Sequence, residues 1–395
     1  MRLFSISGFE MIQSAIVVGG GIAGMASAAV LGRMGVSVTV LEKTQKLIEV
    51  GAGLQLSPNG LCVLRALGLE SELINRGALR AEAVSLRDYR RSGEVARLDL
   101  KRLAPDQVYY FIHREDLLAA LTGAAKRVSA NIRLDQFVVE VRKGEIPEVV
   151  LANGDVLRAE LIVGADGLRS VARSSLNPQS SAFFTKQVAW RAIVPNVVDQ
   201  PNEVRIYMGP GKHIVAYPLR GGTFVNLVAV EECDEWQNEG WRQSGDPDQM
   251  RETFAEFSGG VSPLLNTVEQ TSKWGLFRHL VATTWFDKGI ALVGDAAHPM
   301  LPFMAQGANM ALEDAWALGS AIDAGNIRGY QEKRRKRVSR VVKATQGNAK
   351  RYHLRSGPIR LAAHLGLKTV SKVTPSLMLK PFDWLYRHDV TNKLN

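Results

Sequence analysis

Residues 15–24 read AIVVGGGIAG and place the glycine pattern G-x-G-x-x-G directly after four apolar residues. A continuous apolar run of this kind is typical of a buried parallel strand. Gly19 permits a tight turn, Gly21 lets the backbone approach a pyrophosphate, and Gly24 lets the next helix pack closely on the strand. Free N–H groups at the start of that helix attract phosphate oxygens. The stretch therefore predicts a strand–turn–helix unit that binds a dinucleotide.

The residues that follow continue the same unit. Small side chains extend the expected helix to Met34, Gly35 ends it, and residues 36–41 form a second apolar strand. Glu42 stands at the tip of this strand, where a carboxylate can accept hydrogen bonds from a ribose diol. Because an acid there would repel a 2′-phosphate, the pattern indicates NAD or FAD rather than NADP.

Two further glycine sites lie far along the chain, each after a short apolar run. They read GADG at 164–167 and GD at 294–295. An NAD dehydrogenase would complete its site with a second mononucleotide-binding half rather than with distant aspartates. A helix is expected from Gly307 to about Ile322, and its positive N-terminal end would point toward whatever the GD loop holds. The three sites together predict one long cofactor that carries phosphates, and they favour FAD.

The composition is that of a globular protein with room for two domains. The chain has 395 residues, of which 46% are hydrophobic and 22% are charged. No apolar run approaches the roughly 20 residues that span a bilayer, and residues 1–10 do not resemble a signal peptide. Met11 precedes the first strand, so residues 1–10 are interpreted as an extension. Cys62 and Cys233 form neither a disulfide framework nor a metal-ligand spacing, which predicts a cytoplasmic protein without a metal.

The net charge of +10 is concentrated in one segment. Residues 328–360 hold twelve Lys or Arg against a single acid, Glu332. A basic run can bind nucleic acid or acidic lipid. The small apolar residues within it instead predict an amphipathic helix that packs by its other face, and no nucleic-acid-binding module accompanies it. We therefore expect no nucleic-acid partner, and attraction of an anionic substrate or a nicotinamide cofactor stays open.

The three glycine sites, in this order, resemble the marks of the single-component FAD-dependent aromatic hydroxylases, the group A flavoprotein monooxygenases. The stretch GDAAHPMLPFMAQGANMALEDA at 294–315 is similar to the family's G-D motif over its whole length. Residues 51–59, 112–118 and 384–389 look like the salicylate and 3-hydroxybenzoate hydroxylase branch. The resemblance covers nearly all of residues 12–390.

The resemblance implies an α/β fold of defined organisation. A Rossmann-like FAD-binding domain of the glutathione-reductase type would carry an inserted antiparallel-sheet substrate domain and a C-terminal helical tail. The FAD-binding domain would take residues 12–80, 111–180 and 281–325. The substrate domain would take a segment at 81–110 and its antiparallel sheet at 181–280, and the basic helical region would take 326–395.

The resemblance also implies which residues bind a non-covalent FAD. They come from the three glycine sites, the second strand and the segments around 51–59 and 112–118: Gly19, Gly21, Ile22, Ala23, Gly24, Glu42, Lys43, Gly53, Gln55, Arg114, Asp166, Asp295, Gly307 and Ala308. Gly307 and Ala308 would bring a helix N-terminus to the flavin O2/N1 edge, where the reduced ring is anionic. NADH or NADPH is expected as a transient co-substrate, and both stay open.

Two of the expected catalytic residues lie on one strand. His213 and Tyr217 are four residues apart, so both face the same side of a strand, and the resemblance implies that this side lines the substrate pocket. Our hypothesis is that His213 deprotonates a phenolic substrate, because a histidine near its unperturbed pKa of about 6.5 can do so at neutral pH. A structural histidine at a sheet edge is the alternative.

Tyr217 and three further residues complete the expected substrate site. Tyr217 would bond the substrate hydroxyl or carboxylate, and Gln306 would orient the substrate as part of the catalytic set. Pro302 would shape the wall beside the flavin. Arg191 would bind a substrate carboxylate or, equally, pair with a structural acid.

The expected reaction is hydroxylation of a small, hydroxybenzoate-like aromatic with O2 and NAD(P)H, through a flavin C4a-hydroperoxide, by a monomer or homodimer. One alternative is a flavin hydroxylase or epoxidase of a bulkier quinone- or lipid-like substrate, which would use the apolar stretch 361–379 at a membrane. A second is a flavin-bound regulatory protein with little turnover. Disulfide reductases are disfavoured because the chain lacks a redox cysteine pair, and Gln55 disfavours a hydroxynicotinate substrate.

Overall fold

The computed structural model describes residues 12–47, 53–91, 93–236 and 243–392. The N-terminal extension at 1–10, with the choice between Met1 and Met11 as the start, lies outside these ranges. Residues 51–52, at the start of the expected flavin segment, also lie outside them.

A six-stranded sheet, ordered β19-β20-β12-β1-β2-β8, carries the three glycine sites. Five strands are parallel, and the edge strand β19 is antiparallel to β20. The strands are β1 (Ser14–Val18), β2 (Ser37–Leu41), β8 (Asn131–Arg133), β12 (Leu161–Gly164), β19 (Phe286–Asp287) and β20 (Ile290–Leu292). The predicted apolar runs before the glycine sites are thus confirmed as strands. Because β12 pairs with both β1 and β20, the three sites meet at one edge of the sheet.

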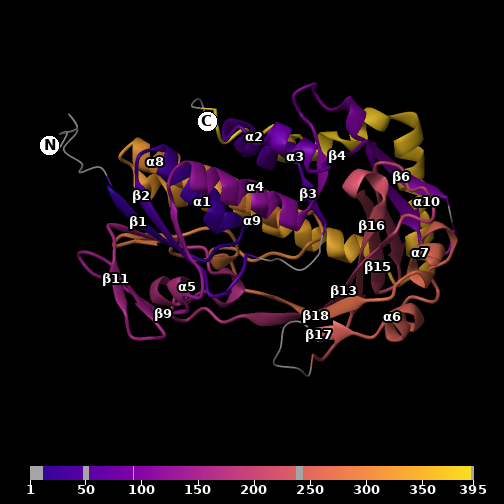
Figure 1. Cartoon of the computed structure of the whole chain (residues 1–395). Coiled ribbons are helices and arrows are strands. Elements are labelled where there is room, and N and C mark those ends of the chain that lie inside the picture. Colours follow the sequence, from indigo (N-terminus) through magenta and orange to yellow (C-terminus); the bar gives the residue numbers. More distant parts are fainter. Residues whose placement is uncertain (1–11, 48–52, 92, 237–242, 393–395) are drawn as a thin grey trace.

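Helices cover this sheet, and Figure 1 shows α1, α4, α8 and α9 lying together on one side of β1 and β2. Helix α1 (Ile22–Arg33) packs between α8 (Gly307–Asp323) and α4 (Arg114–Arg127). Its small side chains allow close packing: a Cβ added to Gly319 of α8 would lie 2.4 Å from the Val30 side chain of α1. The other helices of this half are α2 (Pro58–Ala66), α3 (Glu70–Asn75) and α5 (Val171–Leu176).

Two small antiparallel sheets flank the six-stranded sheet. The first, ordered β3-β7-β4, contains β3 (Gly53–Leu56), β4 (Leu79–Arg80) and β7 (Tyr110–His113). The second, ordered β11-β10-β9, contains β9 (Val138–Arg142), β10 (Glu148–Leu151) and β11 (Val156–Arg158). Strand β3 thereby holds the predicted flavin segment against β7, directly before α4.

An eight-stranded sheet, ordered β17-β18-β13-β16-β15-β14-β5-β6, forms the opposite end of the molecule (Figure 1). Its strands are β5 (Ala83–Asp88), β6 (Glu94–Asp99), β13 (Phe183–Pro195), β14 (Glu203–Gly209), β15 (Lys212–Leu219), β16 (Phe224–Glu232), β17 (Gln243–Gly245) and β18 (Thr271–Arg278). The strands from residues 181–280 pair antiparallel, as predicted, whereas β5 of the segment 81–110 joins this sheet parallel to β14. A hairpin forces antiparallel pairing, but a long connection joins these two strands and leaves either direction possible.

One face of the eight-stranded sheet has its own hydrophobic core. Trp190, Tyr207 and Phe254 are fully buried there. The short helices α6 (Pro247–Thr253) and α7 (Ser262–Asn266) supply part of this core. The opposite face is therefore the one available to a site shared with the six-stranded sheet.

The basic segment forms the long helix α9 (Ile327–Tyr352), followed by α10 (Gly357–Val373) and α11 (Asp383–Tyr386). Val338, Val341 and Ala349 are buried, which confirms the predicted amphipathic packing of α9. The apolar stretch at 361–379 includes most of α10, which packs on β6. Across the described ranges, no helix is both long and apolar enough to cross a membrane.

Part of the basic segment is buried rather than solvated. Arg334 of α9 is 2% exposed and donates to Asp314 at 2.7 Å and to Glu313, both on α8. Arg337 donates two hydrogen bonds to Glu313, at 2.7 and 2.8 Å. Asp314 also bonds the His298 ring. This buried ion cluster joins α8, α9 and the loop after β20.

Candidate active site

A cavity of about 630 Å³ is lined by residues of both large sheets. The three glycine sites meet there, as the sequence predicts. The predicted cofactor residues that line it are Gly19, Gly21, Ile22, Ala23, Glu42, Lys43, Gly53, Gln55, Arg114, Asp166, Asp295, Gly307 and Ala308. Of the predicted substrate residues, Arg191, His213, Tyr217 and Pro302 line the same cavity.

Two carboxylates at the glycine sites are held by the backbone around them. Glu42 accepts a hydrogen bond from the Gly20 N–H at 2.7 Å and from the Thr44 N–H at 2.9 Å. Asp166 accepts from the N–H groups of Val171 and Ala172, at 2.7 and 3.2 Å, and so caps the start of α5. Burial raises the pKa of Asp166, although these hydrogen bonds oppose the rise.

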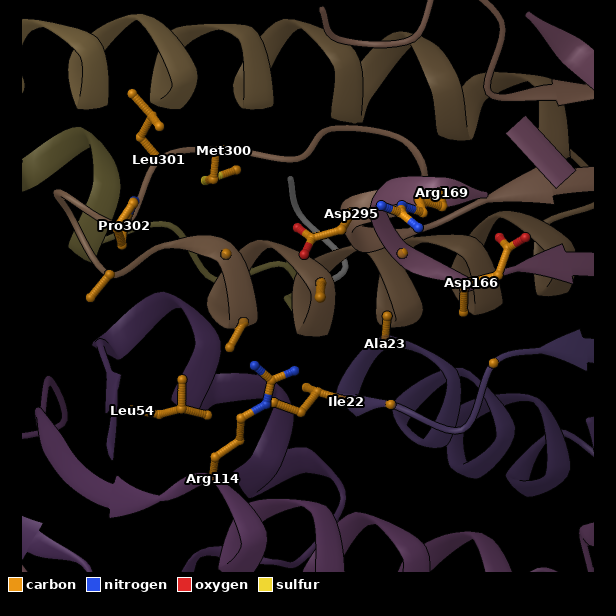
Figure 2. A pocket seen from close by; sticks show the side chains of 18 of the residues that line it. Ile22, Ala23, Leu54, Arg114, Asp166, Arg169, Asp295, Met300, Leu301 and Pro302 are labelled. Carbon is orange, nitrogen blue, oxygen red and sulfur yellow. The ribbon is translucent and has the colours of Figure 1, made fainter. Parts of the chain in front are cut away.

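Arg114 and Asp295 enter the cavity from opposite walls (Figure 2). Burial, with the neighbouring charge of Arg191, lowers the pKa of Arg114 to about 10, so this side chain remains charged at neutral pH. Burial raises the pKa of Asp295, while His298 and Arg114 act in the opposite direction. The two groups place a guanidinium cation and a carboxyl group where a polar part of a ligand would lie.

The N-terminal end of α8 opens onto the cavity at Gly307 and Ala308. Its first turn contains no acidic residue, and a Cβ added to Gly307 would meet nothing within 4 Å. The backbone N–H groups of such a turn carry a partial positive charge. This end of the cavity is suited to an anionic ring edge.

His213 and Tyr217 of β15 both face the cavity, which confirms the predicted common face. His213 is 1% exposed, and its ring centre lies 5.1 Å from that of Phe303. Burial, and secondarily His353, lowers the pKa of His213 well below its ordinary value. The expectation of an unperturbed pKa is therefore wrong, because the ring is enclosed. Burial raises the pKa of Tyr217, which stays protonated.

Arg191 approaches the cavity from β13. Its guanidinium lies 4.9 Å from the centre of the Trp274 ring, which orients a planar cation by stacking. This contact orients the guanidinium of Arg191, which lines the same cavity as His213 and Tyr217.

The comparisons with known proteins agree with this site. A family model described as "FAD binding domain" matches residues 13–345. The chain is 34% identical to a 3-hydroxybenzoate 6-hydroxylase of Klebsiella oxytoca, over 95% of this chain and 96% of that protein. It is 33% identical to the 3-amino-4-hydroxybenzoate 2-monooxygenase PtnB3 of Streptomyces platensis, over 94% of each chain. The chain belongs to the FAD-dependent aromatic hydroxylases.

Solved structures show that this hydroxylase shares their fold. A "Salicylate hydroxylase substrate complex" superposes with a TM-score of 0.81 at 22% identity, covering 97% of both chains. Klebsiella pneumoniae HpxO, complexed with FAD and uric acid, gives a TM-score of 0.84 at 20% identity, covering 97% of this chain and 98% of that one. The family model and the two relatives confirm the predicted family and its FAD cofactor.

The first glycine site of the hydroxylase fits the pyrophosphate of FAD. Gly19 has φ +105°, and a Cβ there would lie 2.5 Å from the Ala165 carbonyl oxygen. Glycine therefore lets the first and second glycine sites come together. The first turn of α1 also has no acidic residue to repel phosphate.

The side chain of Gln306 does not lie where the sequence prediction places it, in the substrate pocket. Its side chain is 1% exposed and is not among the residues that line the cavity. Its amide donates to the Ser57 hydroxyl at 2.9 Å and accepts from Asn59 at 3.1 Å. These bonds hold the start of α8 against the start of α2, so the structure does not bring Gln306 together with His213 and Tyr217.

Two valines that belong to no motif, and a phenylalanine of the G-D stretch, also line the cavity of the hydroxylase. Val228 and Val230 of β16, with Phe303 of the loop before α8, add apolar wall beside His213. The alternation along β16 indicates that the two valines share a face, but it does not say which ligand that face meets. His353 contacts His213 from 140 residues further along the chain, and no local pattern signals such a pair.

We expect Gly24→Ala to weaken FAD binding. Gly24 is not among the cavity-lining residues, but an added Cβ would sit 1.9 Å from the carbonyl oxygen of Gly19, which does line the cavity. Relieving such a clash costs about 1–3 kcal/mol, or about 5- to 150-fold in affinity. The ratio of flavin to protein absorbance after purification measures this loss. Gly347→Ala is the matched control, because its Cβ would meet nothing within 4 Å; equal flavin content in both variants would refute the prediction.

Proposed function

We propose that this protein hydroxylates a small aromatic acid that carries a phenolic hydroxyl, using O2 and NADH or NADPH. The observation that carries the proposal is the shared cavity: His213, Tyr217 and Arg191 line the same space as the FAD-binding residues. When bound, FAD accepts electrons from NAD(P)H and uses them to activate O2. The curated relatives that act on hydroxybenzoates support this substrate class.

The proposed roles of the side chains follow from their chemistry. Because burial keeps His213 neutral at pH 7, its ring can accept the phenolic proton and make the aromatic ring electron-rich. Tyr217 keeps its proton and can donate a hydrogen bond to the substrate oxygen. Arg191 supplies a positive charge for a carboxylate. The valines and Phe303 exclude water from the ring.

The finer organisation is part of the same proposal. The strands of the six-stranded sheet come from residues 14–41, 131–164 and 286–292, and those of the eight-stranded sheet from 83–99 and 183–278. This interleaving supports an FAD-binding domain of the glutathione-reductase type, divided as expected at 12–80, 111–180 and 281–325, with an inserted substrate domain. The proposed cytoplasmic location agrees with the two free cysteines. A monomer or homodimer is part of the same proposal.

The test is oxidation of NADH and of NADPH by the purified yellow protein, with a panel of hydroxybenzoates and with product identification. Stimulated oxidation with a hydroxylated product supports the proposal. Stimulation that yields only hydrogen peroxide identifies a pseudo-substrate. If no aromatic acid stimulates oxidation, the proposal is wrong, and the result favours a quinone- or lipid-like substrate or a regulatory role.

A further inference from the structure

We propose that His353 and Glu232 carry the substrate proton from His213 to solvent. This inference rests on the proposed function, in which His213 receives that proton. His213 Nδ1 lies 2.6 Å from His353 Nε2, and His353 Nδ1 lies 3.1 Å from Glu232 Oε1. The three side chains form one continuous line of hydrogen-bonding groups.

Burial decreases along this line from the cavity outward. His213 and His353 are 1% and 4% exposed, whereas the Glu232 side chain is 34% exposed. Glu232 follows Val228 and Val230 on the same face of β16, so the cavity wall continues into this carboxylate. The line therefore begins at the substrate and ends at water.

An enclosed His213 needs such an exit for its proton. Phe303 and Tyr352 flank its ring, with centres at 5.1 and 5.3 Å. A lasting imidazolium in these surroundings would pay the cost of desolvation. Burial lowers the pKa of His353 as well, so the proton would not rest there either. Movement through both rings keeps each of them neutral before and after the transfer.

The transfer balances when the protons move in sequence. The phenolic O–H bond breaks, and an N–H bond forms at His213 Nε2. The proton on His213 Nδ1 passes to His353 Nε2, and the proton on His353 Nδ1 passes to Glu232. Glu232 then releases it to water, and the same transfers in reverse restore the starting tautomers when the aromatic product takes back a proton.

The charged groups around the line favour this direction. Burial opposes ionisation of Glu232, but hydrogen bonds from Arg355 and His353 outweigh it and lower the pKa of Glu232. Arg355 donates to Glu232 at 2.5 and 3.0 Å from beyond the end of α9. On β15, Lys212 instead bonds the Thr253 carbonyl. Glu232 is thus kept ionised, so a proton that reaches it is released to water rather than retained.

The neighbouring Glu231 supplies a control. It lies on the other face of β16, where it accepts from the Trp190 ring N–H at 2.9 Å. Glu231→Gln keeps that hydrogen bond and removes one charge, as Glu232→Gln does at the proposed exit. The two variants differ in position but not in chemistry.

The experiment mixes FAD-loaded enzyme with 3-hydroxybenzoate without oxygen or NAD(P)H and follows proton release with an indicator dye. We expect fast release by the unaltered enzyme and by Glu231→Gln. In Glu232→Gln and His353→Gln, release should slow at least about tenfold, with unchanged FAD content and affinity for the probe. Added formate should restore the rate in Glu232→Ala, which a purely structural defect would not allow.

Two results would overturn different claims. Release at the unaltered rate in both Glu232→Gln and His353→Gln, or no response to formate, would overturn the relay while leaving His213 as the base. No release by the unaltered enzyme, or normal release by His213→Gln, would contradict the proposed function itself.

Discussion

Replacing His213 with glutamine is expected to lower kcat for product formation by about 10²- to 10⁴-fold while the protein remains yellow. Glutamine retains hydrogen-bonding capacity but cannot accept a proton at neutral pH. The residues proposed to bind FAD lie on other elements: the glycine sites follow β1, β12 and β20, and Arg114 starts α4. The loss should therefore fall on the chemical step and spare cofactor binding.

The measurement is formation of hydroxylated product at saturating substrate, beside the ratio of flavin to protein. His364→Gln is the matched control, because this half-buried histidine lies on α10 and its ring is 3.4 Å from Asp88, away from the cavity-lining residues. Near-normal turnover by His213→Gln would mean that the substrate proton leaves by another route.

Arg334→Met is expected to lower the free energy of unfolding by about 3–5 kcal/mol. Arg334 is buried between Glu313 and Asp314, and methionine fills similar space without charge. The two carboxylates would stay buried with fewer partners. Asp314 would keep His298 and the Gly294 N–H, and Glu313 would keep Arg337.

Urea unfolding at neutral pH measures this loss, and Arg335→Met, on the exposed side of α9, is the control. Burial opposes ionisation of Glu313 and Asp314, but the surrounding cations outweigh it and hold their pKa values below the ordinary range. The stability they contribute is present above the unfolded pKa of about 4 and is lost as the pH falls through the lower folded values. The difference in free energy of unfolding between Arg334→Met and Arg335→Met should therefore become smaller at acidic pH. An equal loss in both variants would contradict a buried role for Arg334.

Local sequence signals predicted the cofactor half well. The apolar run, the glycines and Glu42 act within one strand–turn–helix unit, so their meaning does not depend on distant residues. The alternation on β15 likewise placed His213 and Tyr217 on one face. The convergence of the three glycine sites required a pairing of β12 with β1 and β20 that only the folded sheet defines.

The errors arose where tertiary contacts determine the chemistry. Burial lowers the pKa of His213, but Phe303 and His353, which enclose its ring, are far from it in the sequence, so no local pattern indicates this burial. Gln306 has the right position next to α8 but turns toward Asn59. A run of arginines gave no sign that Arg334 is buried. Such facts depend on which elements pack together, not on periodicity.

The most direct test of the central claim is the fate of molecular oxygen in a single reaction. The FAD-loaded enzyme reacts with NADH or NADPH, oxygen-18 gas and the hydroxybenzoate that best stimulates oxidation. Mass spectrometry then measures the molecular mass of the product. We expect one labelled oxygen atom in a new ring hydroxyl, with one reduced nicotinamide consumed for each product formed. Labelled hydrogen peroxide with unchanged aromatic acid, for every hydroxybenzoate in the panel, would contradict this expectation.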